Sequence, residues 1–184
     1  MNAGPRTLWH VSDDPDIDIF RPHRARTAQI DDELVWAVDE EHVPAYWFPR
    51  DCPRATFWIG PKTSAEDAAW MNGARRVHVT EWDWWERVHS ARLWLYRLPA
   101  DTLEIHDVNA GYYVSRVPVA PLERVEVPDV IAKHADAQIE IRVTTDLWPL
   151  WDRVVGSTLE FSGIRLRNAR APLRPSTAHA LLPR

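Results

Sequence analysis

Short apolar runs separated by charged turns recur along the whole chain. Runs that combine β-branched, aromatic and leucine side chains are typical of strands. The pattern predicts strands at residues 7–11, 34–38, 56–59, 76–80, 93–98 and 140–144. Residues 111–115, 117–119 and 122–127 predict two further short strands around a bend.

Helical signals alternate with these strands. Ser64 precedes two acids and Gly73 follows the apolar positions, which predicts a capped helix between them. Residues 80–83 predict a second capped helix start, at Thr80, and the apolar positions that follow recur at helical spacing up to Val88. Further helices are predicted at residues 146–155 and 129–136, and a short one after His42, where Pro44 suits a first helical turn. The mixture predicts an α+β fold, with a single domain over residues 1–170. Residues 171–184 are rich in Pro, Ala, Leu and Arg and predict a mobile tail.

Composition narrows the classes of function. A formal net charge of −5 does not favour nucleic acid as a partner, because broad phosphate binding needs a basic face. Four arginines near the C-terminal end form either a local basic patch or a solvated face: Arg165, Arg167, Arg170 and Arg174. The chain has neither a signal-peptide pattern nor a stretch of transmembrane length, so we expect a cytoplasmic protein with no membrane partner.

The stretch 34–54 combines a strand, an acidic loop and an aromatic cluster. Its acids and histidine, residues 39–42, are consecutive, and consecutive loop residues rarely converge on one metal ion. We therefore predict no metal site and interpret the acids as a solvated helix start. Cys52, the single cysteine, follows Asp51, whose carboxylate disfavours a reactive thiolate.

His10 lies on the first predicted strand and has two interpretations. A backbone carbonyl at a strand end can satisfy its ring, or the ring can bind a ligand hydroxyl. The 11 tryptophans also have two interpretations. Most will be core residues, while several can line a pocket and stack on a base or a nicotinamide.

The order of several sequence motifs resembles the ADP-ribosyltransferase fold. The motifs are L-W-H-V-S, V-W-A-V, R-L-W-L-Y-R-L-P and Y-Y-V-S-R-V-P-V-A-P, and the resemblance covers residues 7–127. Small proteins of that fold include rifampin ADP-ribosyltransferase and the RNA 2′-phosphotransferases. The resemblance implies a split, strand-rich core with short flanking helices. Nearly the whole chain also resembles a family of uncharacterised bacterial proteins, through V-W-A-V-D-E-E-H-V-P-A-Y-W-F-P-R-D-C-P-R and F-S-G-I-R-L-R-N-A-R.

The enzyme-fold resemblance implies roles for individual residues. His10 matches the first-strand histidine that contacts the ribose and orients NAD in such enzymes. Trp36 falls where the second strand usually offers a tyrosine to stack on nicotinamide; a tryptophan can stack but lacks the phenolic hydroxyl. Tyr46 would close the pocket. Arg50 or Arg116 would hold phosphate, because guanidinium pairs bidentately with phosphate oxygens.

The chain departs from that pattern at the position that normally carries an acid. The residues there are Tyr113, Val114, Ser115 and Arg116, and none is a carboxylate. Breaking the nicotinamide–ribose bond develops positive charge, which a carboxylate stabilises and Arg116 would oppose. Asp107, just upstream, is the nearest substitute. RNA 2′-phosphotransferases also work without that acid and hold a phosphate with basic residues.

Three functional interpretations follow. The first is NAD-dependent ADP-ribosyl transfer, or a related phosphate-linked reaction, on a small molecule or nucleic acid. The second is a non-catalytic nucleotide- or partner-binding module on the same scaffold, and the third is a structural protein with all its aromatic residues in the core. The candidate catalytic residues are His10, Asp107 and Arg116, and the candidate NAD-binding residues are His10, Trp36, Tyr46, Arg50, Tyr113 and Ser115.

Overall fold

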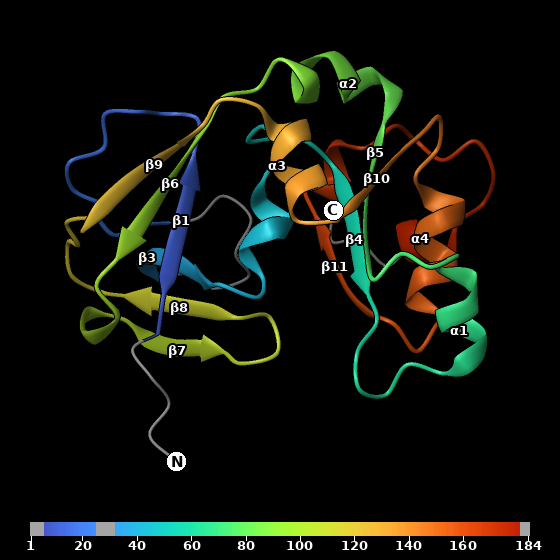
Figure 1. The fold of residues 1–184 in the computed structure, drawn as a ribbon, viewed down its shortest axis with the longest axis horizontal. Coiled ribbons are helices and arrows are strands. Elements are labelled where there is room, and N and C mark those ends of the chain that lie inside the picture. Colours follow the sequence, from blue (N-terminus) through green and yellow to red (C-terminus); the bar gives the residue numbers. More distant parts are fainter. Residues whose placement is uncertain (1–5, 25–31, 181–184) are drawn as a thin grey trace. The chain divides into compact units, whose positions relative to one another are not determined.

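The computed structural model describes residues 6–24 and 32–180 (Figure 1). The chain forms two compact units, each assembled from two separate stretches of sequence. The first unit comprises residues 1–47 and 92–128, and the second comprises residues 48–91 and 129–184. The chain therefore passes between the units three times, after residues 47, 91 and 128.

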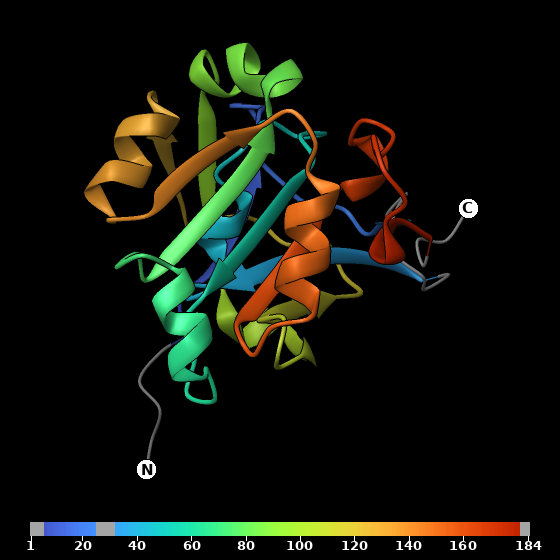
Figure 2. The same cartoon turned by 90° about the vertical axis from the view of Figure 1, so that its right-hand side faces the viewer.

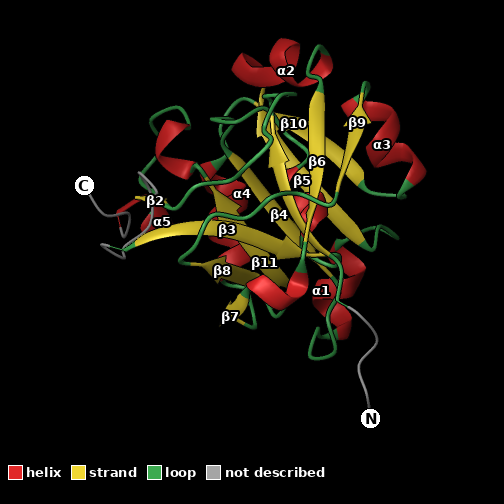
Figure 3. Cartoon of the chain, turned by 90° about the vertical axis from the view of Figure 1, so that its left-hand side faces the viewer, coloured by secondary structure: helices red, strands yellow, loops and turns green. Residues whose placement is uncertain are grey.

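The first unit is built on a seven-stranded sheet within the described residues. Six strands follow the order β7-β8-β3-β1-β6-β9, β2 pairs with β3, and every pairing is antiparallel. Figure 3 shows β9 alongside β6 at one edge. The strands are β1 (Leu8–Ser12), β2 (His23–Arg24), β3 (Glu33–Asp39), β6 (Leu93–Leu98), β7 (Glu104–Asp107), β8 (Tyr112–Ser115) and β9 (Glu123–Val127). Two 3-10 helices, η1 (Val43–Tyr46) and η2 (Ala100–Thr102), complete the unit.

One face of this sheet carries a compact apolar layer of the first unit. Side chains of alternate strand residues point to opposite faces, so every second residue of β1, β3 and β6 enters one layer. The buried members of that layer and the loops that cover it are Leu8, Phe20, Val35, Ala37, Tyr96, Leu98, Leu103 and Val119. Phe20 and Val119 exchange two backbone hydrogen bonds of 2.8 and 2.9 Å, which hold both loops over the layer.

The second unit is built on a four-stranded mixed sheet in the order β10-β5-β4-β11. Only the β10–β5 pair is parallel in this part of the structure. The strands are β4 (Arg54–Trp58), β5 (Arg76–Glu81), β10 (Glu140–Thr144) and β11 (Glu160–Ile164). The helices are α1 (Ala65–Trp70), α2 (Trp82–His89), α3 (Val130–Asp136), α4 (Trp148–Val155), η3 (Leu166–Asn168) and α5 (Thr177–Ala180).

Helices α1 and α4 cover the apolar face of this second sheet, as Figure 2 shows. Phe57 and Val77 on β4 and β5 pack with Trp148 and Trp151 on α4 in one buried cluster. Trp70 on α1 stacks on Phe57, with ring centroids 5.5 Å apart. Alternate residues of β5 point the other way, so the opposite face of this sheet carries polar side chains.

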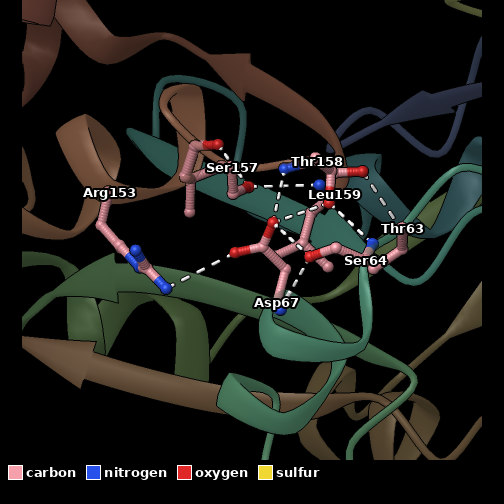
Figure 4. A network of polar contacts seen from close by, with 8 residues as sticks. Thr63, Ser64, Asp67, Arg153, Ser157, Thr158 and Leu159 are labelled. Carbon is pink, nitrogen blue, oxygen red and sulfur yellow. Dashed lines mark hydrogen bonds and ion pairs between the residues drawn. The ribbon is translucent and has the colours of Figure 1, made fainter.

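A carboxylate ties the start of α1 to the loop before β11 (Figure 4). The Ser64 hydroxyl oxygen accepts the Asp67 N–H at 3.1 Å, as its predicted capping role requires. Asp67 Oδ2 accepts the Thr158 hydroxyl at 2.6 Å and the Thr158 N–H at 2.8 Å. These bonds from Thr158 lower the pKa of Asp67 below its ordinary value of 3.8. The tie therefore stabilises the fold above that pH and is lost as the pH falls through the lowered pKa.

Acidic side chains also hold the C-terminal segment. Buried Glu81 accepts the Arg170 N–H at 2.8 Å and the Leu147 N–H at 3.2 Å, although burial raises its pKa. Asp152 accepts the N–H of Ala178, and Ala178 is part of the core. Part of the predicted tail, residues 171–180, thus contacts α4 directly. The mobility of residues 171–184 stays a prediction, and residues 181–184 lie outside the described part of the chain.

The α+β class is confirmed by the two sheets and short helices. Strands β6 and β10 have the predicted bounds. The capped helix start predicted at Thr80 is wrong: Thr80 lies within β5 and donates its hydroxyl to the Pro53 carbonyl, and α2 begins at Trp82. A single domain over residues 1–170 stays a prediction. No helix in the described ranges is long and apolar enough to span a membrane.

The core of the second unit should depend on Phe57. Phe57→Ala removes a fully buried ring, together with the stacking contact of that ring with Trp70. We therefore expect a loss of about 3–5 kcal/mol in the free energy of unfolding. Urea denaturation followed by circular dichroism measures this loss. Phe161→Ala is the matched control, because Phe161 pairs with Phe57 across β11 and β4 but is 42% exposed. Equal losses in both variants would contradict the assignment of Phe57 to the core.

Candidate functional site

Strand register in the first unit decides which predicted site residues share a face. Directly paired residues point to the same face of a sheet. Leu8 pairs with Asp39 and Ala37 pairs with Tyr113, so His10, two residues after Leu8, shares the face of Tyr113. Val35 pairs with Ser115, which adds Ser115 to that face. Trp36 lies between Val35 and Ala37, so its side chain points to the opposite face. The structure therefore brings His10, Tyr113 and Ser115 to one face and Trp36 to the other.

His10 nevertheless contacts the backbone of Trp36. Its Nδ1 lies 2.8 Å from the Trp36 carbonyl oxygen, and its ring lies 4.6 Å from that of Phe20. A carbonyl can only accept, so Nδ1 carries the proton and Nε2 is the acceptor nitrogen of the neutral ring. This contact matches the interpretation of a histidine satisfied by a backbone carbonyl.

Aromatic and phenolic groups gather around Trp36 on its own face. The Trp36 ring meets the rings of His106 and Tyr112 edge to face, at 4.9 and 5.8 Å. The Tyr46 hydroxyl, carried by η1, donates to the Tyr112 hydroxyl at 2.6 Å. These four residues form the Trp36 cluster. Trp36 and Tyr46 were candidate residues from the sequence, whereas His106 and Tyr112 were missed. Tyr112 could have been found from the sequence, because it precedes Tyr113 on a predicted strand and neighbouring strand residues point to opposite faces.

The Trp36 cluster contains two donors whose acceptors are not among the described residues. The Trp36 indole Nε1 is buried and has no hydrogen-bond partner there. The Tyr112 hydroxyl accepts from Tyr46, and its own hydrogen has no acceptor within the same part of the structure. A buried donor without an acceptor costs about 1–3 kcal/mol, so this face has capacity for an oxygen acceptor.

The acidic loop after β3 is ordered by its own side chains. Asp39 Oδ1 accepts the His42 N–H at 3.0 Å and lies 2.7 Å from His42 Nδ1. Glu40 accepts the Trp9 indole N–H at 2.6 Å. Gly111 packs against this pair with a φ of +66°, and a Cβ there would lie 2.7 Å from Asp39 Oδ1 and overlap His42. Asp39 and His42 thus act together to fix the loop that leads to η1.

The candidate catalytic residues Asp107 and Arg116 have structural partners. Asp107 Oδ1 accepts the N–H groups of Asn109 and Ala110 at 2.9 and 3.2 Å, which closes a turn. Arg116 is exposed and pairs with Glu104 at 2.6 Å and Asp32 at 3.1 Å. Both side chains therefore have a local role that requires no ligand.

The remaining predicted residues have ordinary environments. The Ser115 hydroxyl donates to the Val117 carbonyl at 3.1 Å, and the Arg6 guanidinium lies 5.8 Å from the centre of the Tyr113 ring. Arg50 is exposed in the second unit. Cys52 is fully buried, with its Sγ 3.2 Å from the Thr80 hydroxyl oxygen. Burial is the main reason why the pKa of the Cys52 thiol is raised, rather than the neighbouring Asp51 carboxylate.

Metal binding has no support in the described ranges, where no group of three or more His, Cys, Asp or Glu side chains could hold an ion. The fold and these contacts define an α+β protein with an aromatic cluster on one face of an antiparallel sheet. The chain belongs to a family of unknown function (DUF6886), whose model matches residues 9–169. No curated protein and no solved structure matches the chain.

Gly111 should be needed for the ordered loop. Gly111→Ala introduces both a strained positive φ and an overlap with His42. Gly73→Ala is the matched control, because Gly73 has a φ of +89° and a Cβ added there would meet no described atom within 4 Å. We expect Gly73→Ala to cost about 1–2 kcal/mol of unfolding free energy, and Gly111→Ala to cost at least about 1 kcal/mol more. Urea denaturation measures both values, and equal costs would contradict the packing of Gly111 against His42.

Proposed function

We propose that the first unit is a non-catalytic module that binds a nucleotide-type small molecule at the Trp36 cluster. The observation that carries this proposal is the buried Trp36 indole N–H, which has no acceptor among the described residues. A carbonyl, carboxamide or phosphate oxygen of a ligand would accept this N–H and offset its cost. The neighbouring Tyr112 hydroxyl would supply a second donor.

The aromatic composition of the Trp36 cluster supports a planar ligand. Binding sites for small molecules are lined mainly by apolar and aromatic side chains, with few polar groups that fix orientation. The rings of His106 and Tyr112 meet the Trp36 ring on its face, and Tyr46 joins them through the Tyr112 hydroxyl. Nucleotides combine a planar base with several acceptor oxygens, so they fit both properties of the cluster. NAD is the first ligand to test, because it carries two planar bases and a carboxamide.

The contacts of the candidate catalytic residues favour binding over catalysis. A transferase of this kind needs a carboxylate that stabilises developing positive charge. Asp107, the candidate carboxylate from the sequence, accepts two backbone N–H groups of its own turn. Arg116, the candidate phosphate ligand, is paired with Glu104 and Asp32. His10 and Trp36 also point to opposite faces of the sheet, so they would not grip one nicotinamide riboside from two sides.

NAD-dependent ADP-ribosyl transfer on an ADP-ribosyltransferase-like core is our second candidate. It is favoured by the fixed tautomer of His10, whose Nδ1 donates to the Trp36 carbonyl so that Nε2 is the acceptor nitrogen. In that candidate, His10 would accept a ribose hydroxyl, and Tyr113 and Ser115 would lie on the same face. Such a reaction would transfer ADP-ribose to a small molecule or nucleic acid and release nicotinamide.

Trp36→Phe tests the binding proposal, because it keeps an aromatic ring and removes the indole N–H. We expect wild-type protein to bind NAD, ADP-ribose or AMP in calorimetric titrations. The variant should bind the same ligand about 5- to 150-fold more weakly, the equivalent of about 1–3 kcal/mol. Trp94→Phe is the matched control, since Trp94 packs on the opposite, core face. Its affinity should be unchanged. An absence of binding by the wild type, or equal weakening in both variants, would overturn the proposal.

A nicotinamide-release assay separates the two candidates. We expect no release when wild-type protein is incubated with NAD, because Asp107, the candidate carboxylate, is held by the N–H groups of its own turn. Release that is abolished in His10→Ala and retained in His23→Ala would support transfer and refute the non-catalytic proposal. His23 is a suitable control because it is exposed on β2 of the same unit.

A further inference from the structure

Two histidines form a buried pair on the polar face of the sheet in the second unit. His78 on β5 and His134 on α3 are 0% and 1% exposed. His78 Nδ1 lies 3.0 Å from His134 Nε2, and the two rings meet edge to face. His134 Nδ1 lies 2.7 Å from the carbonyl oxygen of Val130, one turn earlier in α3. We call these two residues the histidine pair.

The hydrogen bonds of the histidine pair fix both tautomers. The Val130 carbonyl can only accept, so His134 Nδ1 carries a proton. His134 Nε2 is then the acceptor of the neutral ring, so it accepts the proton of His78 Nδ1. This assignment leaves His78 Nε2 as an unprotonated nitrogen, which is buried and has no hydrogen-bond partner among the described residues.

The arrangement has no position for a further proton. A proton on His134 Nε2 would face the N–H of His78 at 3.0 Å, so their hydrogen bond would break or His78 would shift its own proton to Nε2. A proton on His78 Nε2 would be a buried donor without an acceptor in this part of the structure. Each alternative leaves an unpaired N–H in the interior, which is costly.

We propose that the histidine pair is an acid-sensitive lock, which holds α3 and Phe48 against the sheet of the second unit at neutral pH and releases them when either ring gains a proton. The Phe48 ring packs against both imidazoles, with its centroid 5.8 Å from that of His78 and 5.2 Å from that of His134. Together, Phe48, His134 and His78 form one packed aromatic cluster. A change of charge in this cluster would disturb all three contacts together.

The groups around the pair also oppose protonation. The groups whose positive charge opposes protonation of His78 are His134 on α3, once it is itself protonated, Arg76 on β5 and Arg54 on β4; no carboxylate of the described residues is among them. Thr56 on β4 and Ile141 on β10, the strand neighbours of His78, carry no charge. Burial is the main cause, and these three groups add to it, so the pKa of His78 is held well below its ordinary value of 6.5. Burial is also the main cause that lowers the pKa of His134.

The elements held by the histidine pair lie directly beside two of the three chain crossings between the units. Phe48 is the first residue of the second unit after residue 47, and α3 starts two residues after the crossing at residue 128. Release of Phe48 and α3 would therefore loosen two of the three chain segments that join the units. The consequence would be an acid-induced gain in flexibility at these segments.

The sign and size of the pH effect follow from linkage. Because both pKa values are lower in the folded state, the unfolded chain binds more protons as the pH falls below 6.5. Stability from the neutral pair is thus present above pH 6.5 and lost as the pH falls toward the lowered pKa values. Each histidine changes the unfolding equilibrium constant by up to about tenfold per pH unit, so the pair contributes up to about a hundredfold.

His78→Asn tests the lock. The Asn amide can still donate to His134 Nε2 but does not titrate. We expect the unfolding equilibrium constant of the variant to depend less on pH than that of the wild type, by up to about tenfold per pH unit. Urea denaturation between about pH 5 and 8 measures this dependence. His89→Asn is the matched control, because His89 is exposed on α2 of the same unit. It should keep the wild-type dependence. Equal pH dependence in wild type and His78→Asn would overturn the proposal.

A measurement on the wild type keeps the proposal testable if His78→Asn fails to fold. Nitrogen-15 NMR of the two imidazoles should report Nδ1–H tautomers for both rings at neutral pH. Hydrogen exchange of the α3 amides should accelerate below pH 6.5 relative to that of the α4 amides, after correction for the intrinsic pH dependence of exchange. Rings that protonate near pH 6.5 with α3 still protected would refute the lock.

Discussion

The main physical constraint on this chain is that neither sheet can form from consecutive sequence. The first unit pairs β1 with β6, and the second pairs β5 with β10 and β4 with β11. Each of these pairings closes a long loop, and long loops carry an entropic cost that only later contacts repay. Helix α4 provides much of that repayment in the second unit, because its tryptophans seal the apolar face of β4 and β5. The long-range polar contacts, such as those of Glu81 with Arg170 and of Asp67 with Thr158, form only once these distant segments have come together.

Register also determines which chemistry the first unit can present. Since the side-chain period of a strand is two, neighbouring residues serve opposite faces. Val35 and Ala37 belong to the core while Trp36, between them, joins a cluster of Tyr46, His106 and Tyr112. His10 touches the same strand from the core side through a backbone carbonyl. The two residues that the resemblance to ADP-ribosyltransferases placed in one pocket therefore lie on opposite faces of this sheet.

Much of the fold could be predicted from sequence because its signals are local. Apolar runs indicated the bounds of β6 and β10, and the hydroxyl of Ser64 marked the cap of α1. Strands β7 and β11 were missed because they produce no apolar run. All residues of β7 and most residues of β11 are exposed, so their positions do not require apolar side chains. The histidine pair was also missed. Its two members are far apart in sequence, and their burial follows from the packing of α3, which no local pattern encodes.

The late position of β11 has a consequence for synthesis of the protein on the ribosome. Strand β11 pairs with β4, and α4, which covers the same sheet, also comes from the last third of the chain. Until these segments emerge, Phe57, Val77 and Val79 have no cover from α4, and the β4 edge has no partner. A chain that lacks these segments therefore exposes an apolar sheet face and an open edge, which are features that promote aggregation.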